Sequence, residues 1–273
     1  MTAGAAPPAG YLAAAREAGL VRQVAGRPVV VGVHDDGAGG ERQGFIEYCD
    51  PALLAGNGEE LAAAVLAELP AVDALVLRAP AAAQLGPPWL AHLTYVALAP
   101  AGPDQLPVDD ATVPVRPAGV QDDEPILGWL VQAFETYGAE QRHPGDREAV
   151  RETAEQVLRA PDRVSYVVLE GDRPIGHATL LCEAADDVTA REYVELLDIL
   201  VDAAPPGHGR AVAALESAAR RHAGRLGRTL IGHVVHPADD DARARSILAA
   251  LQRRGWRVDH RYWRRPQPRG AKR

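Results

Sequence analysis

Residues 195–222 read ELLDILVDAAPPGHGRAVAALESAARRH, and this stretch decides the fold of the second half of the chain. A nearly continuous apolar run from Leu196 to Val201 is typical of a buried strand. A Pro- and Gly-rich turn follows the run and leads directly into an alanine-rich amphipathic segment, which is typical of a helix. The pattern therefore predicts a strand, a loop and a helix in immediate succession.

The loop of this unit is suited to binding phosphate. Glycine lets a ligand approach the backbone closely and adopts turn conformations that other residues resist. Amides at a helix N-terminus point outward and favour anions. We expect one concavity to be lined by the successive amides of Gly207, His208, Gly209, Arg210 and Ala211. The loop matches neither GxGxxG nor GxxxxGK[ST], so no Rossmann or P-loop nucleotide motif is present.

The loop instead resembles the acetyl-CoA signature of the Gcn5-related N-acetyltransferase (GNAT) family, [QR]-x-x-G-x-[GA]. Its six positions correspond to residues 206–211; Gly209 and Ala211 match, whereas Pro206 replaces the usual Gln or Arg. The resemblance extends over residues 112–265 and includes the closing helix-Gly-aromatic-strand unit RRGWRV. It implies an α/β (α+β) fold with a mixed, mostly antiparallel sheet flanked by helices, and acetyl-CoA as the cofactor.

Composition restricts the class of protein. The chain has 273 residues, of which 47% are hydrophobic, and no apolar run approaches the roughly 20 residues of a membrane-spanning helix. The N-terminus does not resemble a signal peptide, so we expect a cytoplasmic protein without a membrane partner. Cys49 and Cys182 are far apart, and no Cys or His pattern predicts a metal site.

Charge is divided unevenly along the chain. The first 110 residues contain five Arg, no Lys and thirteen acidic residues, so the whole net charge of −8 lies there. This asymmetry disfavours nucleic acid as a partner and predicts a boundary near residue 105. We therefore expect an acidic domain at 1–105, a GNAT domain at 106–266 and a basic, disordered tail at 267–273.

The first part reads as a small α/β domain. The expected strands are Arg27–Val33, Gln43–Cys49, Val72–Leu77 and His92–Leu98, with a helix at Glu59–Leu69 capped by Asn57. No acetyl-CoA signature occurs between its second strand and its helix. Two readings stay open: a degenerate GNAT-like copy that lost acyl-CoA binding, or an unrelated domain. The Pro-rich residues 101–114 predict the linker.

The second part contains the GNAT elements in family order. The expected strands are Val113–Pro117, Val164–Glu170, Pro174–Cys182, Arg228–Val235 and Trp256–Trp263, besides the strand that begins the signature unit. The expected helices run from Asp122 or Asp123 to Tyr137, from Asp146 to Ala160, from the signature loop to about Leu226, and from Asp239 or Asp240 to Arg254.

The resemblance also implies roles for particular residues. Backbone groups of Leu200 and Val201 would bind the pantetheine arm, with an amide near Val201 as the oxyanion donor. Glu195 stands 11 residues before Pro206, the spacing of the catalytic Glu in histone-acetylating members. His233, in the middle of the strand LIGHVV, is the second candidate for the base that takes the proton of the amine.

Two departures leave a second function open. Leu251 stands where the family commonly has a general-acid Tyr, and Ala244 replaces the usual Asn. We predict an acetyl-CoA-dependent N-acetyltransferase, monomeric or homodimeric, acting on a primary amine of a small molecule, an antibiotic or a peptide by direct transfer. Cys182 has no His or Asp in register as a partner, which disfavours a covalent intermediate. The alternative is a noncatalytic acyl-CoA-binding or regulatory protein.

Overall fold

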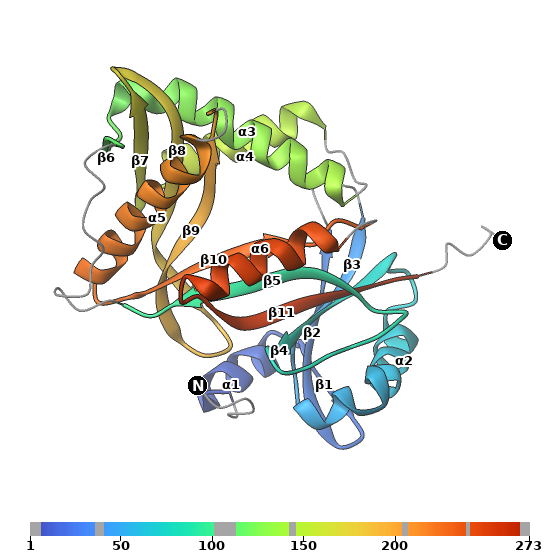
Figure 1. Cartoon of the computed structure of the whole chain (residues 1–273). Coiled ribbons are helices and arrows are strands. Elements are labelled where there is room, and N and C mark those ends of the chain that lie inside the picture. The colour runs from blue at the N-terminus through green and yellow to red at the C-terminus, as the bar shows by residue number, and fades with distance from the viewer. Residues whose placement is uncertain are drawn as a thin grey trace.

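A computed structural model describes residues 7–35, 41–100, 113–141, 146–203, 207–238 and 241–267. Within them, eleven strands form one sheet in the order β1-β2-β3-β4-β11-β5-β10-β9-β8-β7-β6 (Figure 1). The strands are β1 (Val21–Val24), β2 (Arg27–Asp35), β3 (Arg42–Cys49), β4 (Ala74–Pro80), β5 (Leu90–Leu98), β6 (Val115–Pro117), β7 (Arg163–Glu170), β8 (Arg173–Asp186), β9 (Arg191–Val201), β10 (Thr229–Val235) and β11 (Arg257–Pro266).

The helices flank this sheet. They are α1 (Ala9–Glu17), α2 (Glu59–Glu68), α3 (Asp123–Glu140), α4 (Arg147–Arg159), α5 (Gly207–Arg225) and α6 (Ala242–Arg253), with short 3₁₀ helices η1 (Pro51–Gly58) and η3 (Val120–Asp122). Only the pairs β3/β4 and β9/β10 are parallel; the other neighbouring strands are antiparallel. The predicted mixed, mostly antiparallel sheet flanked by helices is confirmed.

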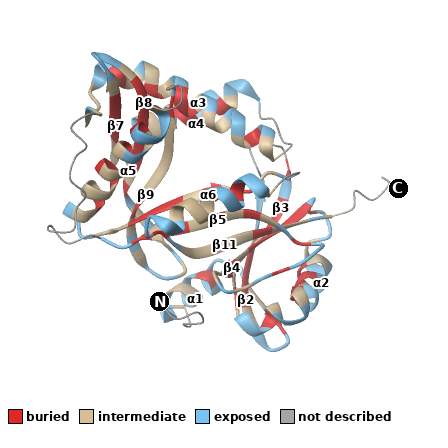
Figure 2. Cartoon of the chain, viewed as in Figure 1, coloured by how far each residue is buried: buried red, intermediate tan, exposed pale blue. Residues whose placement is uncertain are grey.

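The β6–β10 part of the sheet is covered on both faces. Successive strand residues point to opposite faces, so Val168 packs against α5 while Val167 packs against α3 and α4. Leu248 and Leu251 place α6 on the same face as α5. Figure 2 shows the buried residues gathered on the strands, with exposed positions along the outer sides of the helices. None of the described helices is long and apolar enough to span a membrane.

The first half repeats the strand arrangement of the second. Parallel β9 and β10 are joined through α5, and parallel β3 and β4 are joined through η1 and α2, because a parallel pair needs a crossover connection. The two arrangements meet at the antiparallel pair β11 and β5. The order of strands is therefore mirrored about the middle of the sheet.

The two halves exchange a strand. β5, from the first half of the sequence, pairs with β10, while β11, from the end of the chain, pairs with β4. The side chains of the exchanged strands pack in the core of the other half. Val96 and Leu98 of β5 pack in the core beside α5, and Trp263 of β11 packs in the core beside α2. One sheet thus runs across the predicted domains 1–105 and 106–266. Most of the predicted linker and of the tail lies outside the described residues.

Local differences from the sequence predictions are few. Gly58, rather than Asn57, precedes α2, because the Asn57 side chain bonds Gly86 and Pro87 across a loop. The short strand β1 was not expected. Asp239 and Asp240, predicted to cap the last helix, lie outside the described residues, and Asp241 precedes α6.

Candidate active site

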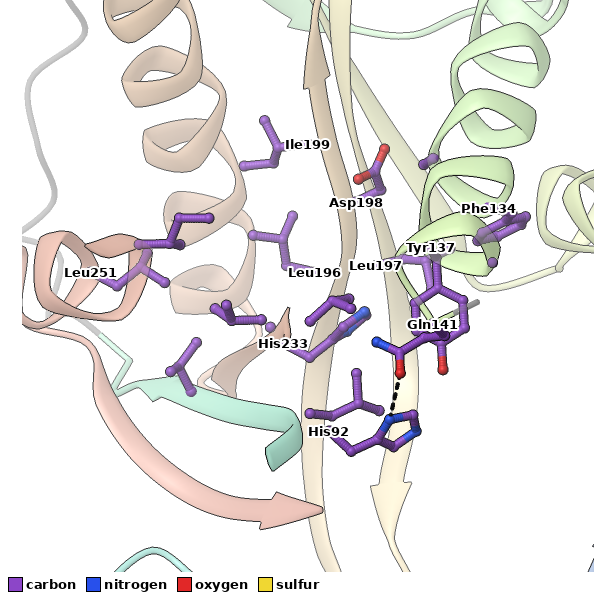
Figure 3. A pocket seen from close by; sticks show the side chains of 18 of the residues that line it. His92, Phe134, Tyr137, Gln141, Leu196, Leu197, Asp198, Ile199, His233 and Leu251 are labelled. Carbon is purple, nitrogen blue, oxygen red and sulfur yellow. Dashed lines mark hydrogen bonds between the residues drawn. The ribbon is translucent and has the colours of Figure 1, made fainter. Parts of the chain in front are cut away.

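Strands β9 and β10 separate to open a cavity. Their pairing is limited to three rungs, from Tyr193 with Thr229 to Glu195 with Ile231. Beyond Glu195 lies a cavity of about 570 Å³ between α3 and α4 on one side and α5 and α6 on the other (Figure 3). Its walls include residues of α3, α4, α5, α6, β9 and β10, and also of β3 and β5 from the first half. The cavity therefore connects the two faces of the sheet.

A bulge in β9 sets which side chains face this cavity. Leu196 pairs with Leu180 and Asp198 pairs with Thr179, so Leu197 has no partner in β8. A bulge of this kind re-aims the residues beside it. Leu196 packs toward α5, whereas Leu197 packs toward α3, and both line the cavity together with Asp198.

The backbone of β9 presents a free edge beyond the bulge. The amide of Asp202 donates to the carbonyl of Ile175 in β8 at 2.7 Å, and a Cβ on Gly176 would lie 2.6 Å from the carbonyl oxygen of Leu200. Backbone groups alternate between the two edges of a strand, so those of Leu200 face β8. The amides of Ile199 and Val201 then point toward the open side, where β10 has diverged.

The predicted phosphate-binding residues form the first turn of α5. His208, Gly209 and Arg210 are exposed, and Ala211 is buried in the core. A Cβ built on Gly207 or Gly209 would meet nothing within 4 Å, so space is open beside both glycines. The first N–H groups of any helix have no partner within it. The next turn supplies Val212 and Glu216 to the cavity wall; Pro206 lies outside the described residues.

Glu195 occupies the last rung before the strands separate. It is half-buried and does not line the large cavity. Burial raises the pKa of its carboxyl, and the charge of Asp162 adds to the effect. Its directly paired neighbour Ile231 precedes His233 by two residues, so Glu195 and His233 lie on the same face of the sheet.

His233 lines the large cavity (Figure 3). Its Nδ1 atom is buried and has no hydrogen-bond partner among the described residues. Burial lowers the pKa of the imidazole, and the charge of Asp198 opposes this effect. The ring also lies 5.6 Å from that of Tyr95, centroid to centroid. His233 is therefore a buried imidazole that faces the cavity and whose pKa lies below its ordinary value.

Leu251 and Ala244, the two residues of α6 that depart from the family pattern, have different surroundings in the structure. Leu251 lines the cavity from α6, so no hydroxyl reaches it from that position (Figure 3). Ala244 is buried beside the sheet. Tyr193 and Tyr262 line a separate cavity of about 120 Å³, and burial raises the pKa of each to about 12. Neither lines the large cavity.

Several cavity residues were missed by the sequence analysis. Phe134, Tyr137 and Gln141 reach the cavity from α3, and Asp198 reaches it from β9 (Figure 3). His92, from β5, donates a hydrogen bond from Nδ1 to Oε1 of Gln141 at 3.0 Å. Glu41 and Gln43, from the first half, form part of the wall and bond each other. Only the folded chain brings these segments together, so no local motif could identify them.

Cys182 has a histidine neighbour that the sequence pattern does not indicate. No His or Asp stands in register with Cys182 in the sequence, but His222 of α5 lies 3.4 Å from its sulfur through Nε2. The contact joins β8 to a helix 40 residues away, so no local pattern reveals it. Burial raises the pKa of the thiol, which disfavours the nucleophilic thiolate. Neither residue lines the large cavity.

The segment of the first half that corresponds to the signature loop is packed against its own chain. Trp89 and Leu85 pack with Leu53 of η1 in the core beside α2. Asn57 accepts a hydrogen bond from the amide of Gly86 at 2.6 Å, and the indole of Trp89 donates to the carbonyl of Asn57 at 3.0 Å. The loop that corresponds to the start of α5 is therefore bound by protein groups.

No family model and no curated protein matches this chain. Among solved structures, it is similar to a GCN5-related N-acetyltransferase from Sphaerobacter thermophilus, with 16% identity, a TM-score of 0.51 and coverage of 89% of this chain and 77% of that one. It is also similar to a functionally unknown conserved protein from Staphylococcus epidermidis, with 12% identity, a TM-score of 0.50 and coverage of 87% and 89%. The chain has a GNAT-like fold.

A further similar structure is a tandem GNAT protein from the clavulanic acid biosynthesis pathway. It shares 16% identity with this chain at a TM-score of 0.48, over 97% of this chain and 90% of that one.

Proposed function

We propose that this GNAT-like chain is an acetyl-CoA-dependent N-acetyltransferase that transfers the acetyl group directly to a primary amine of a small molecule or peptide. One observation carries the proposal: the free edge of β9, the start of α5 and a cavity through the sheet lie next to one another. In this arrangement a cofactor would bind at one face of the sheet, and an acceptor would reach it from the other face.

The residues present fit acetyl-CoA. The open space beside Gly207 and Gly209 admits a pyrophosphate to the amides of the first turn of α5. The amides on the free edge of β9, those of Ile199 and Val201, would hold the pantetheine arm, whereas the backbone groups of Leu200, which face β8, would not. Bound acetyl-CoA would supply the activated thioester. His208 and Arg210, both exposed, would lie beside its phosphates.

The acceptor must lose a proton before it reacts, because an ammonium group has no lone pair. We propose His233 and Glu195 as the two candidates for the base. His233 has the stronger support, because it lines the cavity and its lowered pKa keeps the imidazole neutral at physiological pH. Glu195 lies on the same face, opposite Ile231, which is two residues before His233, and its raised pKa also suits a proton acceptor.

The second candidate function is a noncatalytic acyl-CoA-binding protein. Leu251 in the cavity wall favours it, because this position presents no hydroxyl to protonate a leaving thiolate. A thiol with an ordinary pKa near 8.5 can leave without a dedicated acid, so the observation does not remove catalysis.

Two measurements test the proposal. The first is binding of CoA and acetyl-CoA by calorimetry, in the native protein and in Gly209→Trp, whose new side chain would start in open space and obstruct only a ligand. Gly128→Ala, on the exposed side of α3 with nothing within 4 Å, is the control. We expect Gly209→Trp to weaken CoA binding by at least about 10-fold, the loss of one charge-assisted contact.

The second measurement is the release of free thiol from acetyl-CoA in the presence of a panel of primary amines. Amine-dependent release supports the enzyme. Tight CoA binding without release for any amine would favour the noncatalytic alternative. Equal CoA affinity in Gly209→Trp and the native protein would remove the start of α5 from the cofactor site.

A further inference from the structure

Asp198 is the acidic side chain that β9 presents to the cavity on the side of α3. The bulge at Leu197 turns it there, beside Leu197, Phe134 and Tyr137 (Figure 3). Its side chain is 21% exposed. Oδ2 of Asp198 is buried, and no described residue forms an aligned hydrogen bond with this atom.

Behind Asp198 lies a fully buried histidine. His177 of β8 is 0% exposed, and its Nε2 lies 3.2 Å from Oδ2 of Asp198. Its Nδ1 lies 2.9 Å from the hydroxyl of Thr179, which in turn lies 3.0 Å from the hydroxyl of Ser165. When Ser165 donates to Thr179 and Thr179 donates to Nδ1, the hydrogen of the neutral imidazole is on Nε2, which lies within ion-pair distance of Asp198 but forms no aligned hydrogen bond with it.

The imidazole is held in place from the other side by α3. Trp129 stacks on His177 with ring centroids 5.4 Å apart and an interplanar angle of 7°. The indole of Trp129 donates to Asp202 at 2.7 Å, which fixes the ring against the end of β9. Oδ2 of Asp198 is buried on the side of His177, so a ligand in the cavity would meet the exposed remainder of the carboxylate, with which no described residue forms a hydrogen bond. A carboxylate that is largely buried is costly without a partner, so Asp198 still has capacity to bind.

We propose that Asp198 binds the ammonium group of the acceptor, with His177 as its positioning residue, so that the enzyme selects protonated primary amines that carry an apolar body. The inference rests on the proposed function and names its substrate class. Phe134, Leu197 and Val235 supply the apolar surface of the same cavity. The carboxylate is a charge-assisted acceptor for an ammonium donor.

The position of Asp198 relative to His233 is consistent with this role. Both residues line the same cavity, and the charge of Asp198 acts on the imidazole of His233. An ammonium group bound at Asp198 therefore lies in the part of the cavity that His233 also faces. Asp198 would retain the amine, and His233 would take its proton.

The test compares the binding of ammonium and neutral ligands in the absence of CoA. The probes are 2-phenylethylamine, tyramine and 4-phenylbutylamine, each beside the alcohol that replaces its amino group by hydroxyl, measured by calorimetry. We expect the native protein to bind amines more tightly than their alcohols. Asp198→Asn should weaken amine binding by about 10- to 100-fold and leave alcohol binding unchanged, because one charge-assisted hydrogen bond is lost.

Further variants separate positioning from folding. Asp172→Asn, at an exposed turn, is the matched control, and Asp198→Ser is a second variant in case Asp198→Asn does not fold. His177→Phe keeps the stacked ring but loses Nε2, and it should weaken amine binding by about 3- to 10-fold. His177→Gln restores a donor, so it should recover most of the lost affinity for amines. A purely structural role of His177 would change alcohol binding equally.

Two results would overturn the inference. One is a native protein with no preference for amines over alcohols, and the other is an Asp198→Asn variant, folded by circular dichroism, that keeps the preference. Either result can occur with normal CoA binding, so it is distinguishable from failure of the proposed function. Absent CoA binding with a preserved, Asp198-dependent amine preference would overturn the proposed function alone.

Discussion

Two titratable residues, Glu195 and His233, lie next to the point where the central strands separate. Burial shifts their pKa values in opposite directions, up for the carboxyl and down for the imidazole, and both shifts favour the neutral form. The charged forms are disfavoured because water has been removed from both side chains. These two residues therefore link the pH dependence of stability to that of activity.

Glu195→Gln should make the protein more stable at neutral pH. The folded-state pKa of Glu195 lies above its unfolded value, so its favourable contribution is present below the unfolded pKa near 4.5 and is lost as pH rises through the folded pKa. Glutamine does not titrate, so the gain in melting temperature over the native protein should be near zero at pH 4 and positive at pH 7. Glu183→Gln, exposed on β8, should show no such trend.

The pH profile of acetyl transfer should distinguish the two candidate bases. Because burial lowers the pKa of His233, a reaction that uses it should keep its rate down to pH values below 6.5 and lose it only at more acidic pH. His233→Gln should then reduce kcat/KM by about 10²- to 10⁴-fold. It should also remove the fall in rate at acidic pH, the acidic limb of the profile. An unchanged limb in His233→Gln, together with its loss in Glu195→Gln, would assign the base to Glu195.

At the scale of elements, the close contact between β8 and β9 holds the free edge of β9 in place. Gly176 lies directly opposite Val201, where any Cβ would lie 2.8 Å from the Val201 Cα as well as close to the Leu200 carbonyl. Glycine therefore permits the spacing of the two strands at the end of the pair. The position of the Val201 amide, which we propose as a ligand of the pantetheine arm, depends on that spacing.

Gly176→Ala should reduce both stability and CoA affinity. The added methyl group must displace the backbone of β9, at a cost of about 1–3 kcal/mol in the free energy of unfolding. Denaturant melts and CoA calorimetry would measure the two effects. Gly128→Ala should instead be neutral or stabilising by up to about 1 kcal/mol, because it replaces a glycine within a helix without a clash. Normal stability of Gly176→Ala would contradict the close contact.

At the scale of the whole molecule, the exchange of β5 and β11 makes the two halves depend on each other. β11 fills the place between β4 and β5, and β5 fills the place between β10 and β11. Removing either half would leave strand edges without partners and expose core side chains such as Trp263 and Leu98. We therefore expect the chain to unfold as one cooperative unit.

Separate fragments 1–105 and 106–273 should not fold alone but should form a folded complex when mixed. Each fragment lacks the strand that the other contributes to the middle of its sheet. Circular dichroism and amide dispersion in NMR spectra would show folding only in the mixture. A fragment 106–273 that folds alone and binds CoA would show that the exchanged strand is dispensable.

Trp263→Ala should destabilise the first half although the residue lies at the end of the sequence. Its side chain is buried with residues of β3, β4 and α2, so its removal should cost about 3–5 kcal/mol in the free energy of unfolding. Trp263→Phe should retain most of the stability. Thermal melts followed by fluorescence would measure both variants.

Much of the fold could be predicted because short stretches of sequence specify its helices and strands. The apolar run 196–201, the glycine turn and the alanine-rich segment predict a strand and a helix, and the structure has β9 and α5 there. Charge and proline patterns predict a boundary near residue 105, but one sheet with exchanged strands runs across it, so this boundary stays a prediction. Hydrophobic periodicity and turn residues act over a few neighbouring positions, so they can be read without knowledge of distant contacts.

The sequence by itself predicted most of the elements in order, and it named Glu195 and His233, which lie near the opening between β9 and β10; their roles and that of the loop before α5 stay predictions. Only the tertiary structure decided that β5 and β11 exchange between the halves, that α3 faces the cavity, and that His177 lies behind Asp198. The bulge at Leu197 and the pairing of strands far apart in the chain create these contacts. Long-range pairing leaves no local pattern, because each strand looks the same whichever partner it finds.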